Sequence, residues 1–145
     1  MRHKYYVAIE CFKRGLYYQG IVHDMSKCYP SEFLRSAKYA TGKDSPVGLE
    51  KEEKGFSLAW LNHKGRNKHH WQYWVDVVKG EIYVYDMPRR YVIEMYCDFI
   101  GAGKIYSAKD WDETEPIKYY ENTEKARMIV SDRTRILFEN LLYNN

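Results

Sequence analysis

The chain has 145 residues, with 23 Lys and Arg against 20 Asp and Glu, which gives a formal net charge of +3. This length suits one domain with an ordinary hydrophobic core, and we expect residues 1–145 to form a single domain. The small positive excess does not by itself indicate a nucleic-acid-binding protein. Because 17% of the residues are aromatic, the composition argues against an intrinsically disordered chain.

Cysteine usage and hydropathy narrow the class of protein further. Cys11, Cys28 and Cys97 are odd in number and widely spaced, without a C-x-x-C pair, so neither a cysteine zinc site nor a disulfide framework is supported. We interpret all three as reduced packing residues. No apolar run approaches the roughly 20 residues of a membrane span, and the first residues lack a signal-peptide pattern. We therefore expect a cytoplasmic protein with no membrane partner.

The first half of the sequence predicts helices separated by glycine and proline. An amphipathic pattern starts at His3, and Gly15 suits its end. Pro30 suits the first turn of a later helix and Gly42 its exit, and the Ser, Pro and Gly content of residues 43–48 predicts a loop. The helices expected here span residues 3–14, 17–27, 30–40 and 50–63.

The second half predicts one hairpin among further helices. We expect Gly65 and Asn67 to break the preceding helix, because both are poor in a helix interior. β-Branched and aromatic residues on both sides of Lys79-Gly80 predict a small hairpin. The remaining expected elements are a short helix over 69–74, a long helix from Pro88 to about Tyr106, a loop over 108–116, and helices near 115–122 and 131–143. The predicted fold is mostly α, a compact helical bundle with at most one small hairpin.

An adjacent His23-Asp24 pair in "GIVHDMSK" indicates candidate metal ligands, because imidazole and carboxylate together suit a divalent transition metal. The dipeptide alone is weak evidence. His3 precedes it, and Glu94 and Asp98 lie four residues apart on one face of the long helix. Two acids on one face repel each other unless a cation or proton intervenes. The alternative is that both acids face water.

Several long strings carry a family resemblance: "FKRGLYYQGIVHDMSKCYPSEF", "EKGFSLAWLNHKGRNKHHWQYW" and "YVIEMYCDFIGAGKIY". With His3, they resemble an uncharacterised family of small bacterial and phage proteins, which is similar to the HD-domain superfamily of metal-dependent phosphohydrolases. The resemblance implies an HD-domain-like helical bundle. It also implies that His3, His23, Asp24 and Asp98 coordinate one divalent metal.

The resemblance gives the later histidines a role as well. In several HD proteins, histidines between the His-Asp pair and the last Asp hold a second metal or a phosphate, and His63, His69 and His70 match that order. The alternative is that they are surface or aromatic-packing residues. Because His69 and His70 are neighbours, we expect only one of them to face inward. We interpret the tryptophans nearby as core residues.

Polar side chains around these motifs are candidates for binding phosphate. Arg66 offers a guanidinium that matches phosphate oxygens, and Lys27 offers a point charge; both are weighed against ordinary solvated cations. Glu32 is a candidate to orient a metal-bound histidine through a hydrogen bond, although helix N-terminal charge complementarity explains it equally well. Gly101 and Gly103 are expected to permit close helix packing.

These features predict a metal-dependent phosphohydrolase acting on a nucleotide or another small phosphate ester. The divalent metal (Mn, Fe, Co, Ni, Zn or Mg) would activate a water, with Asp24, Asp98 or Glu94 orienting or deprotonating it and Lys27 contacting the phosphate. One rival is a non-catalytic HD-like module that binds or sequesters a nucleotide. A single-stranded nucleic-acid binder using "KGRNKHHW" is a further, less favoured alternative. A homo-oligomer stays open.

Overall fold

A computed structural model describes residues 2–41 and 45–144. The chain forms two compact units: unit 1 comprises the residues up to His23 and from His69 onward, and unit 2 is Asp24–Lys68. The described residues are mostly helical, with one two-stranded antiparallel sheet, which confirms the predicted fold class. The single domain stays a prediction. Within the described ranges, no helix combines the length and the apolar character needed to cross a membrane.

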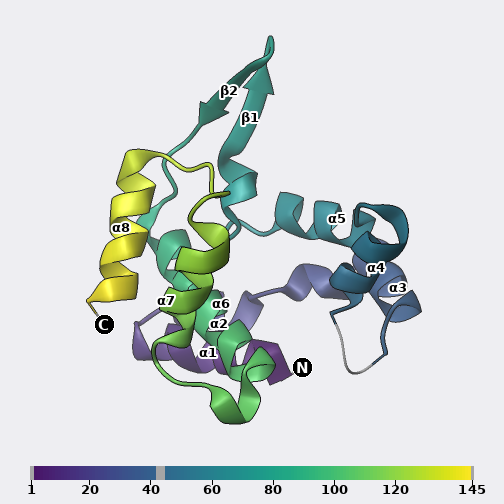
Figure 1. Ribbon diagram of the computed structural model, residues 1–145, viewed down its shortest axis with the longest axis horizontal. Coiled ribbons are helices and arrows are strands. Elements are labelled where there is room, and N and C mark those ends of the chain that lie inside the picture. The colour runs from purple at the N-terminus through teal and green to yellow at the C-terminus, as the bar shows by residue number, and fades with distance from the viewer. Residues whose placement is uncertain (1, 42–44, 145) are drawn as a thin grey trace. The chain divides into compact units, whose positions relative to one another are not determined.

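Helix α6 (Arg89–Tyr106) is the central element of unit 1 (Figure 1). It contacts α1 (Arg2–Lys13), α7 (Glu115–Tyr119) and α8 (Asp132–Tyr143), while α2 (Tyr17–Val22) packs on α1. Apolar side chains of α6 and α8 contribute most of the larger core. Trp71 and Trp74 are partly buried and pack against it. The interpretation of these two tryptophans as core residues is therefore confirmed.

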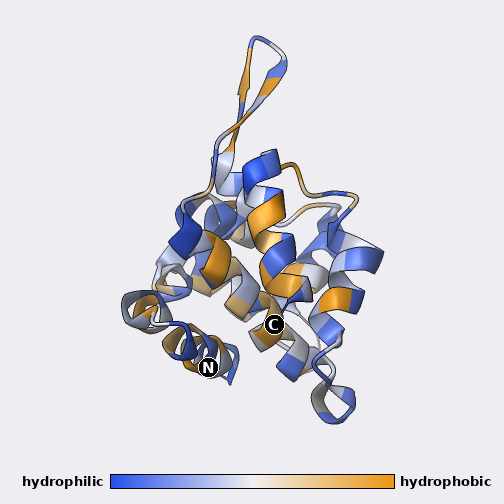
Figure 2. Cartoon of the chain, turned by 90° about the vertical axis from the view of Figure 1, so that its left-hand side faces the viewer, coloured by the Kyte–Doolittle hydropathy of each residue, from blue (hydrophilic) through white to orange (hydrophobic). Residues whose placement is uncertain are grey.

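A hairpin with two positive-φ residues extends from the helices of unit 1 (Figure 1). Strands β1 (Val75–Val78) and β2 (Glu81–Val84) pair in antiparallel register, following the 3-10 helix η2 (Trp71–Trp74). Lys79 and Gly80 have φ of 54° and 85°, which is typical of the two-residue turns whose twist matches a hairpin. Hydrophobic residues lie on both strands (Figure 2), and the predicted hairpin is confirmed.

Unit 2 contains the 3-10 helix η1 (Met25–Cys28) and helices α3 (Pro30–Lys38), α4 (Pro46–Lys54) and α5 (Leu58–Arg66). The expected single helix over 50–63 is wrong. Gly55, at φ 79°, ends α4, and the hydroxyl of Ser57 accepts the N–H of Trp60 to begin α5.

Other expected boundaries also differ from the structure. The loop expected over 43–48 is wrong from Pro46 onward, because Ser45 caps α4; Gly42 and the first residues of that loop lie outside the described residues. Gly65 does not break α5, which continues to Arg66.

Three further expected elements are shorter or begin elsewhere. The helix expected over 17–27 ends at Val22, since Asp24 adopts a left-handed φ of 56°. In the segment 69–74 only the 3-10 helix η2 forms. The loop expected over 108–116 contains a 3-10 helix, η3 (Ala108–Asp110), and ends where α7 begins; the helix predicted near 115–122 then continues as a π-helical turn, η4 (Tyr120–Glu124).

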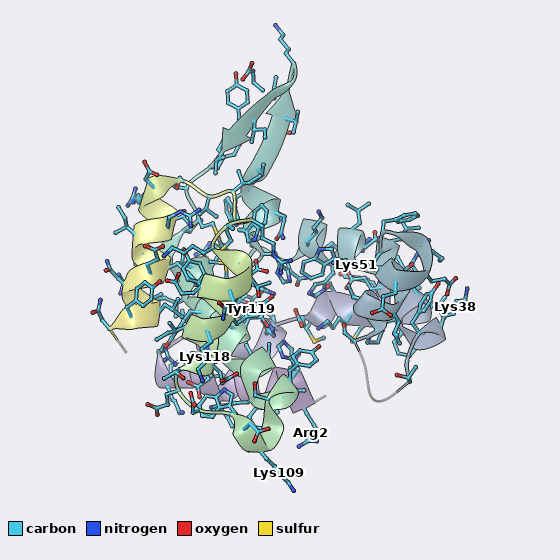
Figure 3. The ribbon with its side chains drawn as sticks, viewed as in Figure 1. Arg2, Lys38, Lys51, Lys109, Lys118 and Tyr119 are labelled. Carbon is cyan, nitrogen blue, oxygen red and sulfur yellow. The ribbon has the colours of Figure 1, made fainter. Side chains whose placement is uncertain are left out.

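Charged and hydrophobic side chains are both exposed in each unit. Lys38 on α3, Lys51 on α4 and Lys118 on α7 are exposed and lie at the periphery of their helices (Figure 3). They alternate with acids such as Glu115, with which Lys118 forms an ion pair at 2.8 Å.

Close packing of α1 against α6 depends on Gly101. A Cβ at this position would lie 2.5 Å from Cγ2 and 3.2 Å from the backbone nitrogen of Val7. Cys11 and Cys97 are fully buried free thiols beside this contact. The packing role is confirmed for Gly101 and these two cysteines, whereas Cys28 is exposed and the packing interpretation is wrong for it. A Cβ at Gly103 would lie 3.0 Å from the Trp111 indole nitrogen and 3.9 Å from Cβ of Glu115, the first residue of α7.

A buried carboxylate on α1 collects three cations. Glu10 accepts hydrogen bonds from Lys13, Arg14 and Lys104 at 2.8–2.9 Å. Burial alone would raise the pKa of Glu10, but these hydrogen bonds outweigh it and lower the pKa to about 2. Lys104 belongs to α6, so this ion pair is a second tie between α1 and α6.

We expect Gly101→Ala to destabilise unit 1 by about 1–2 kcal/mol. Overpacking against a backbone atom costs roughly 1–3 kcal/mol, which exceeds the gain of about 1 kcal/mol in helix propensity. Urea unfolding measures the change. Gly65→Ala is the matched control, because its added methyl meets nothing within 4 Å, and it should stabilise by about 0.5–1 kcal/mol. Equal effects of the two substitutions would contradict the packing argument.

We expect Glu10→Gln to destabilise the protein by about 2 kcal/mol near neutral pH, because Arg14 and Lys104 lose their shared anion. The folded pKa of Glu10 lies below its ordinary value of 4.5. The stabilisation is therefore complete above about pH 4.5 and is lost as the pH falls toward 2. Unfolding followed over this range should show a shallower pH dependence for the variant. Exposed Glu52→Gln should leave the wild-type profile unchanged.

Candidate metal centre

Three of the predicted ligands meet in unit 1. His3 lies in the first turn of α1, His23 follows the end of α2, and Asp98 lies in the middle of α6. The Nε2 atom of His3 is 2.8 Å from Oδ1 of Asp98 and 3.5 Å from Nε2 of His23. Oδ1 of Asp98 is 3.6 Å from the same His23 nitrogen. Helices far apart in sequence thus place two imidazoles at one carboxylate oxygen.

Glu94 and His69 adjoin this group. Oε1 of Glu94 lies 3.0 Å from Nδ1 of His23 and 3.1 Å from Nδ1 of His69. The other ring nitrogen of His69, Nε2, lies 3.9 Å from Oδ2 of Asp98. His69 is buried and is the inward-facing member of the neighbouring pair, as expected; His70 is half-buried, with its ring centre 4.2 Å from that of His69.

Both acids of α6 are held ionised by the histidines. Burial would raise the pKa of Glu94, but hydrogen bonds from His23 and His69 outweigh it and keep the pKa below its ordinary value. For Asp98, too, burial acts upward, and its contacts with His23 and His3 hold the pKa well below its usual range. The alternative in which both acids merely face water is therefore wrong.

The donor set suits a metal ion. His3, His23 and Asp98 form one group that could hold a cation, and His23, His69 and Glu94 form another. In a tetrahedral shell with bonds of 2.0–2.1 Å, neighbouring donor atoms lie about 3.3 Å apart. The 3.5 and 3.6 Å separations around His23 are close to this spacing. Imidazole with carboxylate favours a transition metal over Ca²⁺.

Unit 2 holds the remaining predicted residues around His63. Nδ1 of His63 is 2.9 Å from Oε2 of Glu32, and Nε2 is 3.2 Å from Oδ1 of Asp24. Lys27 forms an ion pair with Asp24 through the other carboxylate oxygen. Glu32 is therefore placed to orient His63, and the role of His63 as a metal-bound histidine stays a prediction.

The sequence reasoning missed two polar side chains of this cluster. Ser26 donates to Oε2 of Glu32 at 2.9 Å, and the Asn67 amide donates to the Ser26 hydroxyl at 2.6 Å. Arg66, on the more exposed side, contacts Oε1 of Glu32 at 3.3 Å. Both Ser26 and Asn67 lie inside the quoted motif strings. Their spacing from the candidate histidines and acids, however, forms no pattern that indicates a role in a site.

The sequence-predicted residues therefore gather in two clusters, one in each unit. The cluster of unit 1 contains His3, His23, His69, Glu94 and Asp98. The cluster of unit 2 contains Asp24, Lys27, Glu32, His63 and Arg66. The metal-binding, phosphate-binding and catalytic roles of these residues stay predictions.

A family model covers nearly the whole chain. Residues 1–144 match DUF5662, described as a family of unknown function. Neither the curated proteins nor the solved structures include a match to this sequence. The likeness to HD-domain phosphohydrolases stays a prediction from the motif strings. Because the match spans residues 1–144, the chain belongs to the DUF5662 family.

Proposed function

We propose that the protein is a metal-dependent phosphohydrolase acting on a nucleotide or another small phosphate ester. The observation that carries the proposal is the convergence of two imidazole Nε2 atoms on one ionised carboxylate, Asp98. His3 and His23 would be neutral ligands and Asp98 the charged one, in one divalent-metal centre.

The exposure of these side chains favours a reactive centre over a structural one. The side chain of His23 is fully buried, whereas those of His3 and Asp98 are 25% and 18% exposed. A centre that solvent reaches from one side suits a catalytic metal, because catalytic sites keep a position open for water or substrate. A structural site closes its shell with four protein ligands.

The residues of the centre divide the work between charge and position. A bound divalent ion lowers the pKa of a coordinated water and screens negative charge on a phosphate. Asp98 would offset part of the ion's charge, and its depressed pKa makes it a poor proton acceptor near neutral pH. His23, buried between Glu94 and Asp98, would fix the position of the ion relative to α6.

We expect Mn²⁺, Co²⁺, Ni²⁺ or Zn²⁺ to stabilise the protein against unfolding. A ligand that binds only the folded state stabilises by about 2.7 kcal/mol at 100 times its dissociation constant. Thermal unfolding of untagged protein, with and without each metal, measures this. Asp98→Asn should remove the metal-dependent increase, and Asp112→Asn, an exposed acid, should retain it. A metal effect of equal size in both variants would contradict the assigned site.

We expect phosphate release from nucleotides or simple phosphate monoesters, dependent on one of these metals. His23→Ala and Asp98→Asn should reduce the rate by at least about a hundredfold, since both remove a ligand. A screen for inorganic phosphate with and without chelator measures it. Metal-independent release, unaffected by either substitution, would overturn the proposal. Equimolar retention of a nucleotide without product would favour the non-catalytic binding module instead.

A further inference from the structure

One buried carboxylate oxygen contacts two histidines. Oε1 of Glu94 lies 3.0 Å from Nδ1 of His23 and 3.1 Å from Nδ1 of His69. All three side chains are buried, with exposed fractions between 0% and 6%. The two imidazole rings lie beside each other, with centres 4.4 Å apart. Glu94 therefore contacts both rings through the same kind of nitrogen.

This arrangement determines where the ring protons lie. An ionised carboxylate oxygen accepts hydrogen bonds and donates none, so Nδ1 of each neutral ring must carry a proton. A neutral imidazole has one N–H, which leaves Nε2 of both rings as a lone-pair donor. In His23 this nitrogen lies 3.6 Å from Oδ1 of Asp98, and in His69 it lies 3.9 Å from Oδ2.

Two lone pairs directed at a carboxylate repel it unless a positive charge lies between them. A proton on either ring would serve in the absence of metal, and a cation would serve better because it attracts both rings and the carboxylate together. The two oxygens of Asp98 thus have imidazole nitrogens on both sides: His3 and His23 at Oδ1, His69 at Oδ2.

We infer that Glu94 is a positioning residue that fixes His23 and His69 in the same Nδ1–H tautomer, and that His69 is a ligand of the metal centre. The inference rests on the proposed metal centre and extends it. Glu94 is 5% exposed, and its Oε1 is bonded to two rings, so it acts on the histidines and not on a substrate water. A carboxylate that holds a metal-bound histidine in this way also increases the basicity of the ring.

The test replaces Glu94 by Leu, which removes both acceptor oxygens, and follows the two imidazoles directly. ¹⁵N NMR of the histidine rings in metal-free protein at about pH 9, well above the ordinary imidazole pKa of about 6.5, reports which nitrogen carries the proton. We expect Nδ1–H for both rings in the wild type and a changed tautomer population of both rings in Glu94→Leu. Affinity for Zn²⁺, measured by chelator competition, should fall about 10- to 100-fold.

Matched variants separate this role from a general loss of structure. Glu124→Leu removes another buried carboxylate of the same unit, whose described partners are Tyr119 and Arg127, and it should leave both tautomers and the Zn²⁺ affinity unchanged. His69→Gln should weaken Zn²⁺ binding while His23 keeps its Nδ1–H tautomer. If Glu94→Leu does not fold, Glu94→Asp retains the charge but shortens the reach, and the same changes in tautomer and Zn²⁺ affinity are expected from it.

Two outcomes would overturn the inference. One is a Glu94→Leu protein (or Glu94→Asp, where Glu94→Leu does not fold) whose rings both keep the wild-type tautomer with Zn²⁺ affinity within about threefold of wild type. The other is unchanged Zn²⁺ affinity in His69→Gln. Neither readout depends on phosphate release, so an inactive protein that passes these tests would overturn the hydrolase proposal alone.

Discussion

The close approach of α1 to α6 is the constraint on which the rest of unit 1 depends. Three contacts occur at successive positions along the two helices: His3 with Asp98, Val7 with Gly101, and Glu10 with Lys104. The helices therefore run in the same direction, with a glycine where the backbones come nearest. The imidazole and carboxylate of the candidate centre lie about one helical turn from that glycine. A wider helix spacing would separate His3 from Asp98, so the site requires the packing.

Buried charge is the second constraint, and the structure compensates each buried acid differently. Glu10 is neutralised by three cations of its own unit, which is a structural solution. Glu94 and Asp98 are compensated only by imidazoles among their described contacts, and imidazoles change charge near neutral pH. These groups have the geometry of an ordinary structural ion pair. Their charge is not fixed, however, because a metal can replace their protons. This difference in partners, more than burial itself, distinguishes the candidate centre from the Glu10 cluster.

Local signals in the sequence were enough to predict the elements that are bounded by a turn-forming glycine or by proline. The turn at Lys79-Gly80 and the proline before α6 predicted the hairpin and the long helix, because each residue type restricts the backbone directly. The break between α4 and α5 at Gly55 also had a signal in the sequence, namely a glycine followed by a serine two positions later. Continuous apolar and charged residues on both sides outweighed that signal, and one long helix was expected where two exist.

The partners within the site were beyond what spacing can predict. Four-residue spacing placed Glu94 and Asp98 on one face of α6, but it could not show that this face meets histidines from three separate segments. The role of Glu94 depends on distances to two rings that are 46 positions apart in the chain. A histidine-rich string such as "NHKGRNKHH" supplies candidate ligands. Tertiary packing decides which partner each ring nitrogen contacts.

The same device occurs independently in each unit. In unit 1 a buried glutamate contacts Nδ1 of His23 and His69, and in unit 2 a buried glutamate, Glu32, contacts Nδ1 of His63. In every case Nε2 is left facing an aspartate oxygen: Asp98 for the first two rings and Asp24 for the third. A purely structural histidine needs only one good partner. A carboxylate on each nitrogen of three rings is an excess of negative charge, which Lys27 and Arg66 offset in unit 2 and which a cation would relieve in unit 1. Because the same contacts occur in both clusters, a chance arrangement of polar side chains is a poor explanation for either one. The repetition also accounts for the concentration of the imidazoles beside a small number of acids.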